Sequence, residues 1–192
     1  VNGAASGFAL FDGTAGDFAA ENAKRLVFAH LIRTSGWREF ETLHKSDEPQ
    51  TRSKWIKERT CLESAMGDMF VRSDVELLHL CGTQGIHYAA STGVCAVLTP
   101  EHLAVGHLGD SRICLLTQDR GMVDQSRMST NNISGEFLTM DHKPDQVSER
   151  RRIERCGGSV EYLHNHNNKP FIRGGDFAVR KAMQEQPMQQ FY

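Results

Sequence analysis

Hydrophobic residues near the start of the chain follow two different spacings. A continuous apolar run at residues 8–11 stops at Asp12, which is typical of a buried strand that leads into a turn. After this turn, apolar residues recur at three- and four-residue steps over residues 19–31, and this spacing predicts an amphipathic helix. Gly36 fits the end of that helix, because glycine is the residue that most often follows a helix end.

The next segment changes from polar to amphipathic. Residues 38–53 are mostly polar or charged and contain Pro49, which predicts an exposed connection. Between Trp55 and Phe70 the apolar residues return to helical spacing and predict a second amphipathic helix. We interpret its apolar stripe as a packing surface and not as a cofactor site.

Three short strand-like runs follow a segment that is rich in small residues. The runs are residues 94–98, 102–105 and 112–116. Turn-forming residues at 99–101 and 109–111 separate them. This pattern predicts an antiparallel meander.

The last third of the chain is more polar. Residues 118–135 predict a loop, residues 137–140 a further strand, and residues 148–155 a short charged helix that ends at Gly157 and Gly158. Two early helices followed by hairpin-connected strands favour the α+β class, because a doubly wound sheet would alternate strands with helices.

Length and charge narrow the classes of function. The chain has 192 residues, which suits one domain, and we expect residues 1–192 to form a single domain. Lys plus Arg number 22 against 24 Asp plus Glu, so no broad basic surface is available for a nucleic-acid backbone. The apolar runs are far shorter than the roughly 20 residues that cross a bilayer. We therefore expect neither nucleic-acid binding nor a membrane span.

The cysteines and the chain ends add two expectations. The five cysteines are widely spaced and lack a Cys-x-x-Cys pair, which favours buried thiols in a reducing compartment. We therefore expect an intracellular location, in the cytoplasm or the nucleus. The chain starts at Val1 and stops at Tyr192 without the features of natural termini, so we expect it to be part of a longer protein.

Five short motifs occur in a fixed order along the chain. They are 8–17 (FALFDGTAGD), 90–93 (ASTG), 107–112 (HLGDSR), 138–144 (LTMDHKP) and 157–160 (GGSV). Together these motifs resemble those of the metal-dependent serine/threonine protein phosphatase 2C family. The resemblance implies an antiparallel β-sandwich flanked by helices, which agrees with the α+β pattern, and it leaves this chain without the N-terminal and C-terminal motifs of the family.

The resemblance also implies a site for two divalent ions, Mg²⁺ or Mn²⁺, that activate a water for attack on phosphorus. Asp12 matches the carboxylate that bridges the two ions, and Gly13 matches a residue that offers its backbone carbonyl. Asp110 matches a position that supports a further, weaker metal ion. Each aspartate also has a purely structural alternative, since Asp in turns commonly accepts hydrogen bonds from turn amides.

One departure from the family lies within the motif that carries Asp12. Where the resemblance places a His that donates a proton to the departing Ser or Thr oxygen, this chain has Thr14. General acid catalysis contributes about 10²–10⁴-fold, and a hydroxyl does not readily donate a proton near pH 7. The family's Glu-Asp pair upstream and two aspartates downstream also have no counterpart in these residues.

Two hypotheses for function follow. The first is a divergent type 2C phosphatase that hydrolyses phosphoserine and phosphothreonine in phosphoprotein substrates. The second is a pseudophosphatase that keeps the fold and binds protein partners without catalysis, and Thr14 favours it. A full-length sequence with the upstream pair and both downstream aspartates would favour the first hypothesis.

Other polar residues of the motifs suit structural roles. We expect Arg112 to be an ion-pair partner that holds adjacent loops together, and His142 with Lys143 to bond neighbouring backbone. Residues 150–152, all arginine, predict the wet face of a helix, with a docking patch for acidic or phosphorylated partners as the alternative. The His-Asn-His at 164–166 lacks the further ligands of a metal site and predicts a solvated loop.

Overall fold

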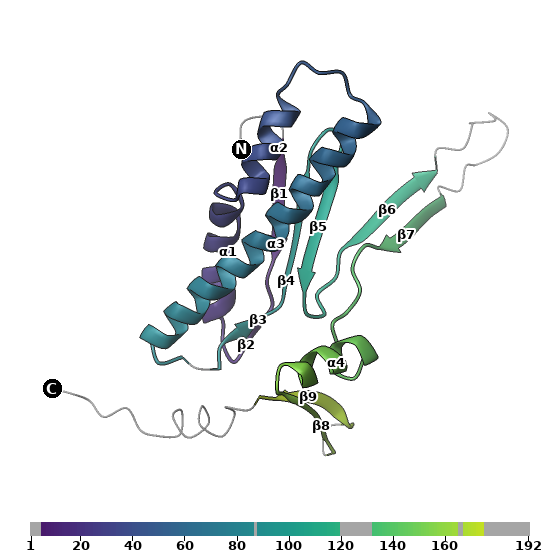
Figure 1. Ribbon diagram of the computed structural model, residues 1–192. Coiled ribbons are helices and arrows are strands. Elements are labelled where there is room, and N and C mark those ends of the chain that lie inside the picture. Colours follow the sequence, from purple (N-terminus) through teal and green to yellow (C-terminus); the bar gives the residue numbers. More distant parts are fainter. Residues whose placement is uncertain (1–4, 87, 120–131, 165–166, 175–192) are drawn as a thin grey trace.

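The computed structural model of the chain describes residues 5–86, 88–119, 132–164 and 167–174 (Figure 1). The elements in these residues are, in order, β1 (Ser6–Leu10), β2 (Gly13–Thr14), α1 (Phe18–Leu31), α2 (Ser35–His44), α3 (Arg52–Thr83), β3 (Ala90–Ser91), β4 (Gly93–Leu98), β5 (Leu103–Leu108), β6 (Cys114–Asp119), β7 (Asn132–Phe137), α4 (Val147–Arg155), β8 (Ser159–Leu163) and β9 (Lys169–Arg173). Each strand pair in the described part is antiparallel.

The largest sheet has β4 in the middle, with β1 on one side and β5 on the other. Helices α1, α2 and α3 lie on one face of it (Figure 1). Glycines on this face allow the close approach of the helices. A Cβ atom added at Gly7 would come within 2.8 Å of the Phe28 ring, and one at Gly106 would come within 2.7 Å of the Phe70 ring.

The opposite face of this sheet is apolar and open among the described residues. Phe8 is 61% exposed and Leu10 is 60% exposed. The strand register places Leu98 and Leu103 on the same face, and both are exposed as well. The prediction of a buried strand at 8–11 is therefore wrong, because every residue of β1 is exposed, Ala9 included, and Phe11 is only partly buried.

The hydrophobic core lies between the helices and the sheet. Its buried members are Val27, Leu31, Trp37, Phe40, Cys61, Leu62, Ala65, Met66, Met69, Cys95 and Val97. The first predicted helix, α1, packs its apolar face against the sheet. The buried residues of this face are Ala19, Ala23, Val27 and Leu31. The three- and four-residue spacing seen in the sequence is thus the spacing of residues that face the sheet.

The helix expected to end at Gly36 ends earlier, and a new helix contains that glycine. α1 ends at Leu31 and α2 begins at Ser35, where the Oγ1 of Thr34 accepts a hydrogen bond from the Trp37 N–H at 3.1 Å. Such an N-cap satisfies one of the free amides of a first turn. The prediction of an exposed connection is wrong for residues 38–44, which belong to α2, and correct for the segment around Pro49.

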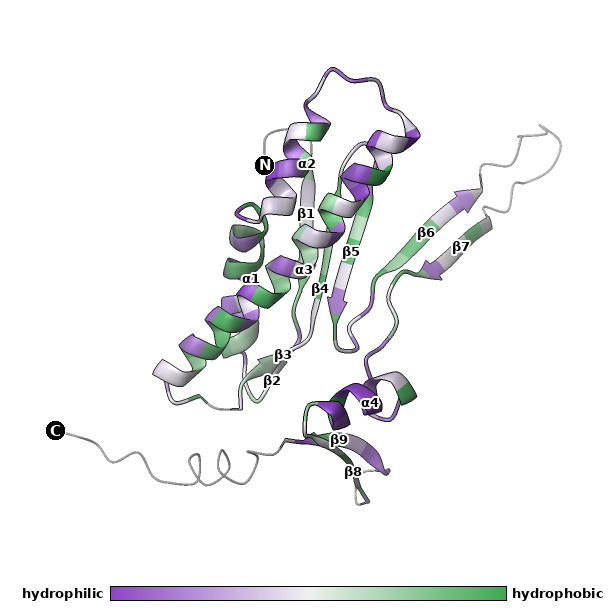
Figure 2. Cartoon of the chain, in the orientation of Figure 1, coloured by the Kyte–Doolittle hydropathy of each residue, from purple (hydrophilic) through white to green (hydrophobic). Residues whose placement is uncertain are grey.

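Helix α3 is much longer than the amphipathic pattern predicted. The pattern over residues 55–70 is confirmed, but the helix continues to Thr83. Beyond Phe70 it carries the exposed apolar residues Val71 and Val75, and apolar and polar residues are mixed along the side of the helix that Figure 2 shows. Among the described residues, no helix is both long enough and apolar enough to cross a bilayer.

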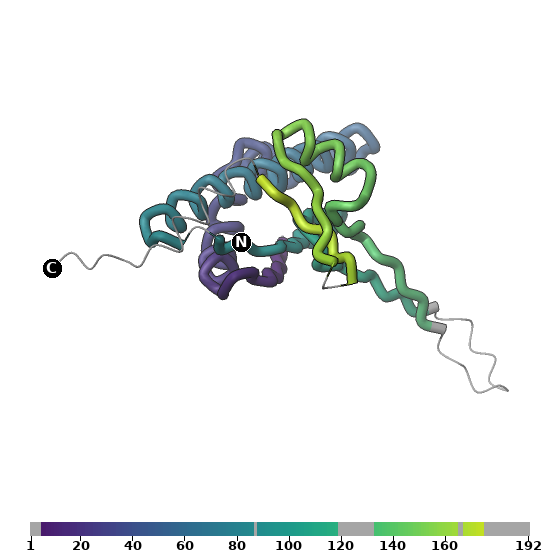
Figure 3. The backbone as a smooth tube through the Cα atoms, turned by 90° about the horizontal axis from the view of Figure 1, so that it is seen from below, coloured from purple at the N-terminus to yellow at the C-terminus, as the bar shows by residue number. Residues whose placement is uncertain are grey.

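The predicted meander is only partly formed. β4 pairs with β5, as predicted, but β6 pairs with β7 and not with β5. The hairpin β6–β7 points away from the three-stranded sheet (Figures 1 and 3). Its second strand occupies 132–137, so the predicted strand at 137–140 is displaced, and most of the predicted loop, residues 120–131, lies outside the described residues.

The end of the described chain is a helix followed by a hairpin. The short charged helix is confirmed as α4, and Gly157 after it has φ of +80°. β8 and β9 then form a two-stranded ladder. Two of the three residues in the His-Asn-His segment, 165 and 166, lie outside the described residues, as do residues 175–192.

The cysteines are free thiols, but they are not all buried. Cys61, Cys81 and Cys95 are buried, whereas Cys114 and Cys156 are exposed. Burial raises the pKa of the Cys95 thiol to about 12. The prediction of buried thiols is therefore confirmed for the first three and wrong for the other two.

A buried polar cluster joins α2 and α3 to the β4–β5 hairpin. Glu58 is fully buried, and its Oε2 lies 2.9 Å from the Nε2 of His102 and accepts a hydrogen bond from Gln50 at 3.0 Å. The Nδ1 of His44 lies 3.6 Å from the other carboxylate oxygen. Burial acts to raise the pKa of Glu58, but the hydrogen bonds from His102 and Gln50 outweigh it, so the pKa lies below its usual value.

Candidate metal centre

The backbone around Asp12 is fixed to the start of β4, while its side chain is free of the loop. The carbonyl oxygen of Asp12 accepts hydrogen bonds from the Thr92 N–H at 2.9 Å and from the Ser91 hydroxyl at 3.1 Å. The Asp12 N–H donates to the Thr92 Oγ1 at 3.3 Å. Asp12 is exposed, and no described residue donates a hydrogen bond to its carboxylate. This geometry does not support the structural alternative, in which the Asp12 carboxylate accepts hydrogen bonds from the amides of its own turn.

The turn after Asp12 is tight. A Cβ atom added at Gly13 would lie 2.6 Å from the Gly16 carbonyl oxygen, so this position accepts glycine alone. Ala15 and Gly16 both have positive φ, of 58° and 102°. Thr14 is exposed and pairs through its backbone with β3, so its hydroxyl is on the surface beside the turn.

The turn that carries Asp110 meets the Asp12 turn through Thr92. Gly109 has φ of +88°, and a Cβ atom there would lie 2.7 Å from the Thr92 Cγ2. The Thr92 Oγ1 lies 2.6 Å from the Ser111 Oγ. Thr92 therefore bonds to both turns, and the structure brings the two predicted carboxylates to the same end of the sheet. Asp110 is exposed, like Asp12.

An ion-pair network holds the next motif against the Asp110 turn. The Arg112 guanidinium donates two hydrogen bonds to the Asp141 carboxylate, at 2.6 and 2.7 Å. Lys143 lies 3.1 Å from the same carboxylate. The hydrogen bonds from Arg112 and Lys143 hold the pKa of Asp141 well below its usual range. The prediction that Arg112 is a structural ion-pair partner is confirmed. Lys143 pairs with the Asp141 side chain and not, as was expected, with neighbouring backbone.

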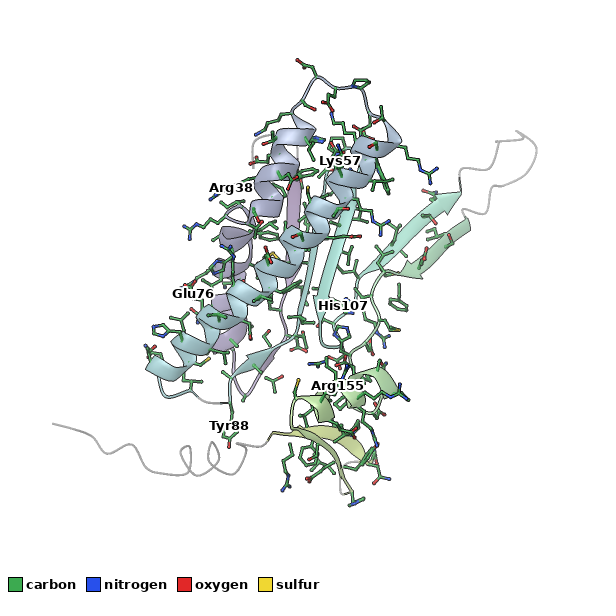
Figure 4. All side chains as sticks on the ribbon, viewed as in Figure 1. Arg38, Lys57, Glu76, Tyr88, His107 and Arg155 are labelled. Carbon is green, nitrogen blue, oxygen red and sulfur yellow. The ribbon has the colours of Figure 1, made fainter. Side chains whose placement is uncertain are left out.

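Two stacked histidines complete this junction. The rings of His107 and His142 lie 4.4 Å apart, and the His142 N–H donates to the Gly109 carbonyl oxygen at 2.9 Å. The His107 Nε2 is 2.7 Å from the Met140 carbonyl oxygen (Figure 4). The expected backbone role of His142 is thus confirmed. The sequence analysis missed His107, although its position beside the Gly-Asp-Ser-Arg turn was a usable signal.

Asp12 and Asp110 are the residues that the sequence predicted for a divalent-metal site. Exposed carboxylates of Asp12 and Asp110 are the oxygen ligands that Mg²⁺ and Mn²⁺ prefer. However, the described part of the chain contains no group of three or more His, Cys, Asp or Glu side chains that could hold a metal ion. Two carboxylates are too few to neutralise two dications, so these residues alone do not complete a two-metal site.

Comparisons with known proteins identify the family of this chain. The family model of protein phosphatase 2C matches residues 2–169. Protein phosphatase ppm-1.A of Caenorhabditis elegans is 36% identical over 80% of this chain and 28% of its own length. Probable protein phosphatase 2C 69 of Arabidopsis thaliana is 30% identical over the whole chain and 43% of its own length.

A solved structure is similar over nearly the whole chain. The crystal structure of a serine-threonine phosphatase 2C from Toxoplasma gondii is 47% identical, with a TM-score of 0.80 over 98% of this chain and 57% of that protein. The chain spans less than half the length of the Caenorhabditis elegans and Arabidopsis thaliana relatives. The expected α+β fold, with antiparallel sheets and flanking helices, is confirmed. The chain belongs to the protein phosphatase 2C family.

Proposed function

We propose that this chain forms part of a metal-dependent phosphatase that hydrolyses phosphoserine and phosphothreonine in proteins. The observation that carries the proposal is the exposed carboxylate of Asp12, whose backbone is anchored by Thr92 to the turn of Asp110. In this proposal Asp12, Asp110 and the Gly13 carbonyl contribute to a site for Mg²⁺ or Mn²⁺. A bound divalent ion would supply an activated water.

Residues 1–192 then belong to a single phosphatase 2C-like domain. The open apolar face of the β1-β4-β5 sheet supports this proposal. Exposed side chains such as Phe8 and Leu10 form a surface that a second sheet of a sandwich would bury.

Thr14 determines how fast we expect phosphate hydrolysis to be. Its exposed hydroxyl lies beside the turn of Asp12 but does not readily give up a proton near pH 7. We therefore propose a phosphatase that is slow on alkyl phosphates such as phosphoserine. Aryl phosphates need less proton assistance, because their leaving group is already a weak base.

The alternative is a pseudophosphatase that binds protein partners without catalysis. Thr14 favours it, since the proton donor implied by the family motif is replaced.

The first test measures Mn²⁺-dependent release of phosphate from a phosphothreonine peptide by the full-length protein that contains this chain, because these residues alone do not complete a two-metal site. We expect Asp12→Ala to abolish turnover and Thr14→His to raise it about 10-fold or more, because a proton donor is restored. Asp47→Ala is the matched control, since Asp47 is an exposed aspartate in the α2–α3 connection. It should leave the rate unchanged.

The pseudophosphatase predicts a different result. The parent protein, Asp12→Ala and Thr14→His would then share the rate of the buffer, both with the peptide and with a fluorogenic aryl phosphate. That outcome would exclude the hydrolase.

A further inference from the structure

The two candidate carboxylates follow strands on opposite sides of β4. β1 ends at Leu10 and β5 ends at Leu108, and both strands flank β4 (Figure 1). The register aligns these two strand ends with the first two residues of β4. Asp12 and Asp110 each lie two residues beyond their strand. They therefore lie at the same end of the sheet, with the start of β4 between their turns.

The width of the sheet separates the two turns. Neighbouring strands are about 4.8 Å apart, so the ends of β1 and β5 are roughly 10 Å from each other. Paired ions in two-metal sites lie only about 3.5–4 Å apart. Because an aspartate side chain is short, Asp12 and Asp110 can serve neighbouring ions only if both turns are held inward, over the start of β4.

Thr92 is the residue directly before β4, and its side chain contacts both turns. Its Oγ1 accepts a hydrogen bond from the Asp12 N–H at 3.3 Å and lies 2.6 Å from the Ser111 Oγ. Its methyl group packs against Gly109, where an added Cβ would come within 2.7 Å of it. One partly buried side chain thus joins the turn after β1 to the turn after β5.

Other hydrogen bonds hold each turn separately. The Ser91 hydroxyl fixes the first turn to the start of β4, and the His142 N–H fixes the second turn to the 138–144 motif. Neither of these bonds joins the two turns to each other. The bond between the Thr92 and Ser111 hydroxyls does.

We propose that Thr92 is a positioning residue that sets the relative placement of the Asp12 and Asp110 carboxylates. It acts through its hydroxyl bond to Ser111 and does not touch an ion itself. The inference rests on the metal site of the proposed function, to which both carboxylates contribute. Groups that orient the ligands of a metal ion typically contribute about 10–100-fold to its affinity.

The Mn²⁺ affinity of the full-length protein that contains this chain tests the proposal. Electron paramagnetic resonance measures this affinity without a substrate, because the signal of free aqueous Mn²⁺ is lost on binding. Thr92→Val removes the hydroxyl and keeps the shape of the side chain, and we expect it to weaken Mn²⁺ binding about 10-fold or more. Thr92→Ser keeps the hydroxyl and should restore most of the affinity.

Thr117 provides a matched control. Its Oγ1 also lies 2.6 Å from a serine hydroxyl, that of Ser134, but this pair belongs to the β6–β7 hairpin. Thr117→Val should leave the Mn²⁺ affinity unchanged. Because each valine variant breaks a hydroxyl pair of the same length, a difference between them reports where the bond lies.

Hydrogen–deuterium exchange without metal separates positioning from general destabilisation. Thr92→Val removes the acceptor of the Asp12 N–H and should speed exchange in both turns. Ser111→Ala breaks only the hydroxyl pair, so it should speed exchange at 109–111 and leave the Asp12 amide protected. The core amides of α3 should keep their protection in both variants.

The outcomes distinguish this inference from the proposed function. If Asp12→Ala leaves the Mn²⁺ affinity unchanged, the metal site and the positioning role both fail. If Asp12→Ala weakens binding and Thr92→Val does not, only the positioning role fails. It also fails if Thr92→Ser restores nothing, or if Thr92→Val speeds exchange throughout the core. The expected pattern of affinities without any turnover would support the positioning role and exclude the hydrolase.

Discussion

At the scale of single residues, the Asp12 turn depends on backbone conformations that few residues adopt. Ala15 has φ of +58°, a left-handed conformation that costs an L-amino acid roughly 1–2 kcal/mol. Gly16, at +102°, adopts its conformation without that cost. The turn that presents the carboxylate is therefore strained at one alanine.

Replacing that alanine should stabilise the protein. Ala15→Gly relieves the left-handed strain, and part of the gain is offset because glycine has more freedom in the unfolded chain. We expect the free energy of unfolding to rise by roughly 0.5–1 kcal/mol, measured by urea denaturation. Gly16→Ala is the opposite control. An added Cβ there meets open space, so its expected loss of about 1 kcal/mol reports backbone strain alone.

The Arg112–Asp141 ion pair makes stability depend on pH. Because the pKa of Asp141 is lower in the folded protein than its ordinary value of about 3.9, the pair stabilises the fold above that value. The contribution is lost as the pH falls below about 4. We expect Asp141→Asn to lower the free energy of unfolding at neutral pH, and the difference from the parent to shrink in acid. An equal difference at both pH values would contradict this, and Asp47→Asn should change neither.

At the scale of elements, glycines decide how closely the helices approach. Gly36 lies in the first turn of α2, where an added Cβ would come within 2.6 Å of the Cys61 carbonyl oxygen and 2.9 Å of the Ala65 nitrogen. Both atoms belong to the backbone of α3, so neither yields easily. The crossing of α2 over α3 therefore requires glycine at this position.

Gly36→Ala should separate α2 from α3. Overpacking of this kind costs about 1–3 kcal/mol in the free energy of unfolding. Gly82→Ala, in α3, meets nothing within 4 Å and should stabilise the helix by about 0.5–1 kcal/mol. Thermal unfolding followed by circular dichroism compares the two. If Gly36→Ala and Gly82→Ala both raised the melting temperature, the close approach of α2 to α3 at Gly36 would be contradicted.

At the scale of the whole molecule, the Glu58 cluster ties together segments that are distant in sequence. Glu58 in α3 bonds to His102 at the β4–β5 hairpin and to Gln50 in the α2–α3 connection. A buried carboxylate is favourable only while it is paired. The cluster therefore makes the helical layer and the sheet interdependent.

Removing the buried carboxylate should be costly. We expect Glu58→Ala to lower the free energy of unfolding by about 3–5 kcal/mol, because His102 and Gln50 lose their buried partner. Glu63→Ala removes an exposed glutamate from the same helix and should change stability by less than about 1 kcal/mol. Chemical denaturation measures both. Similar losses in the two variants would show that burial of Glu58 contributes nothing.

Local pattern in the sequence determined the main elements and the order of the motifs. Spacing and motifs predicted the buried faces of α1 and of the first half of α3, the β4–β5 hairpin, the α4 helix and the Arg112 ion pair. These features are set by contacts between residues close in sequence or by side-chain chemistry. The prediction that Gly36 ends a helix was wrong, because a glycine at a helix end and a glycine at a helix crossing look alike in sequence.

Only the tertiary structure decided which surfaces meet. It placed Asp12 and Asp110 on turns joined by Thr92, and it paired β6 with β7. It also buried Glu58, a charged residue whose hydrogen-bond partners Gln50 and His102 come from other segments. These outcomes depend on packing between segments far apart in sequence, and the free energy of such contacts is absent from any local pattern of residues.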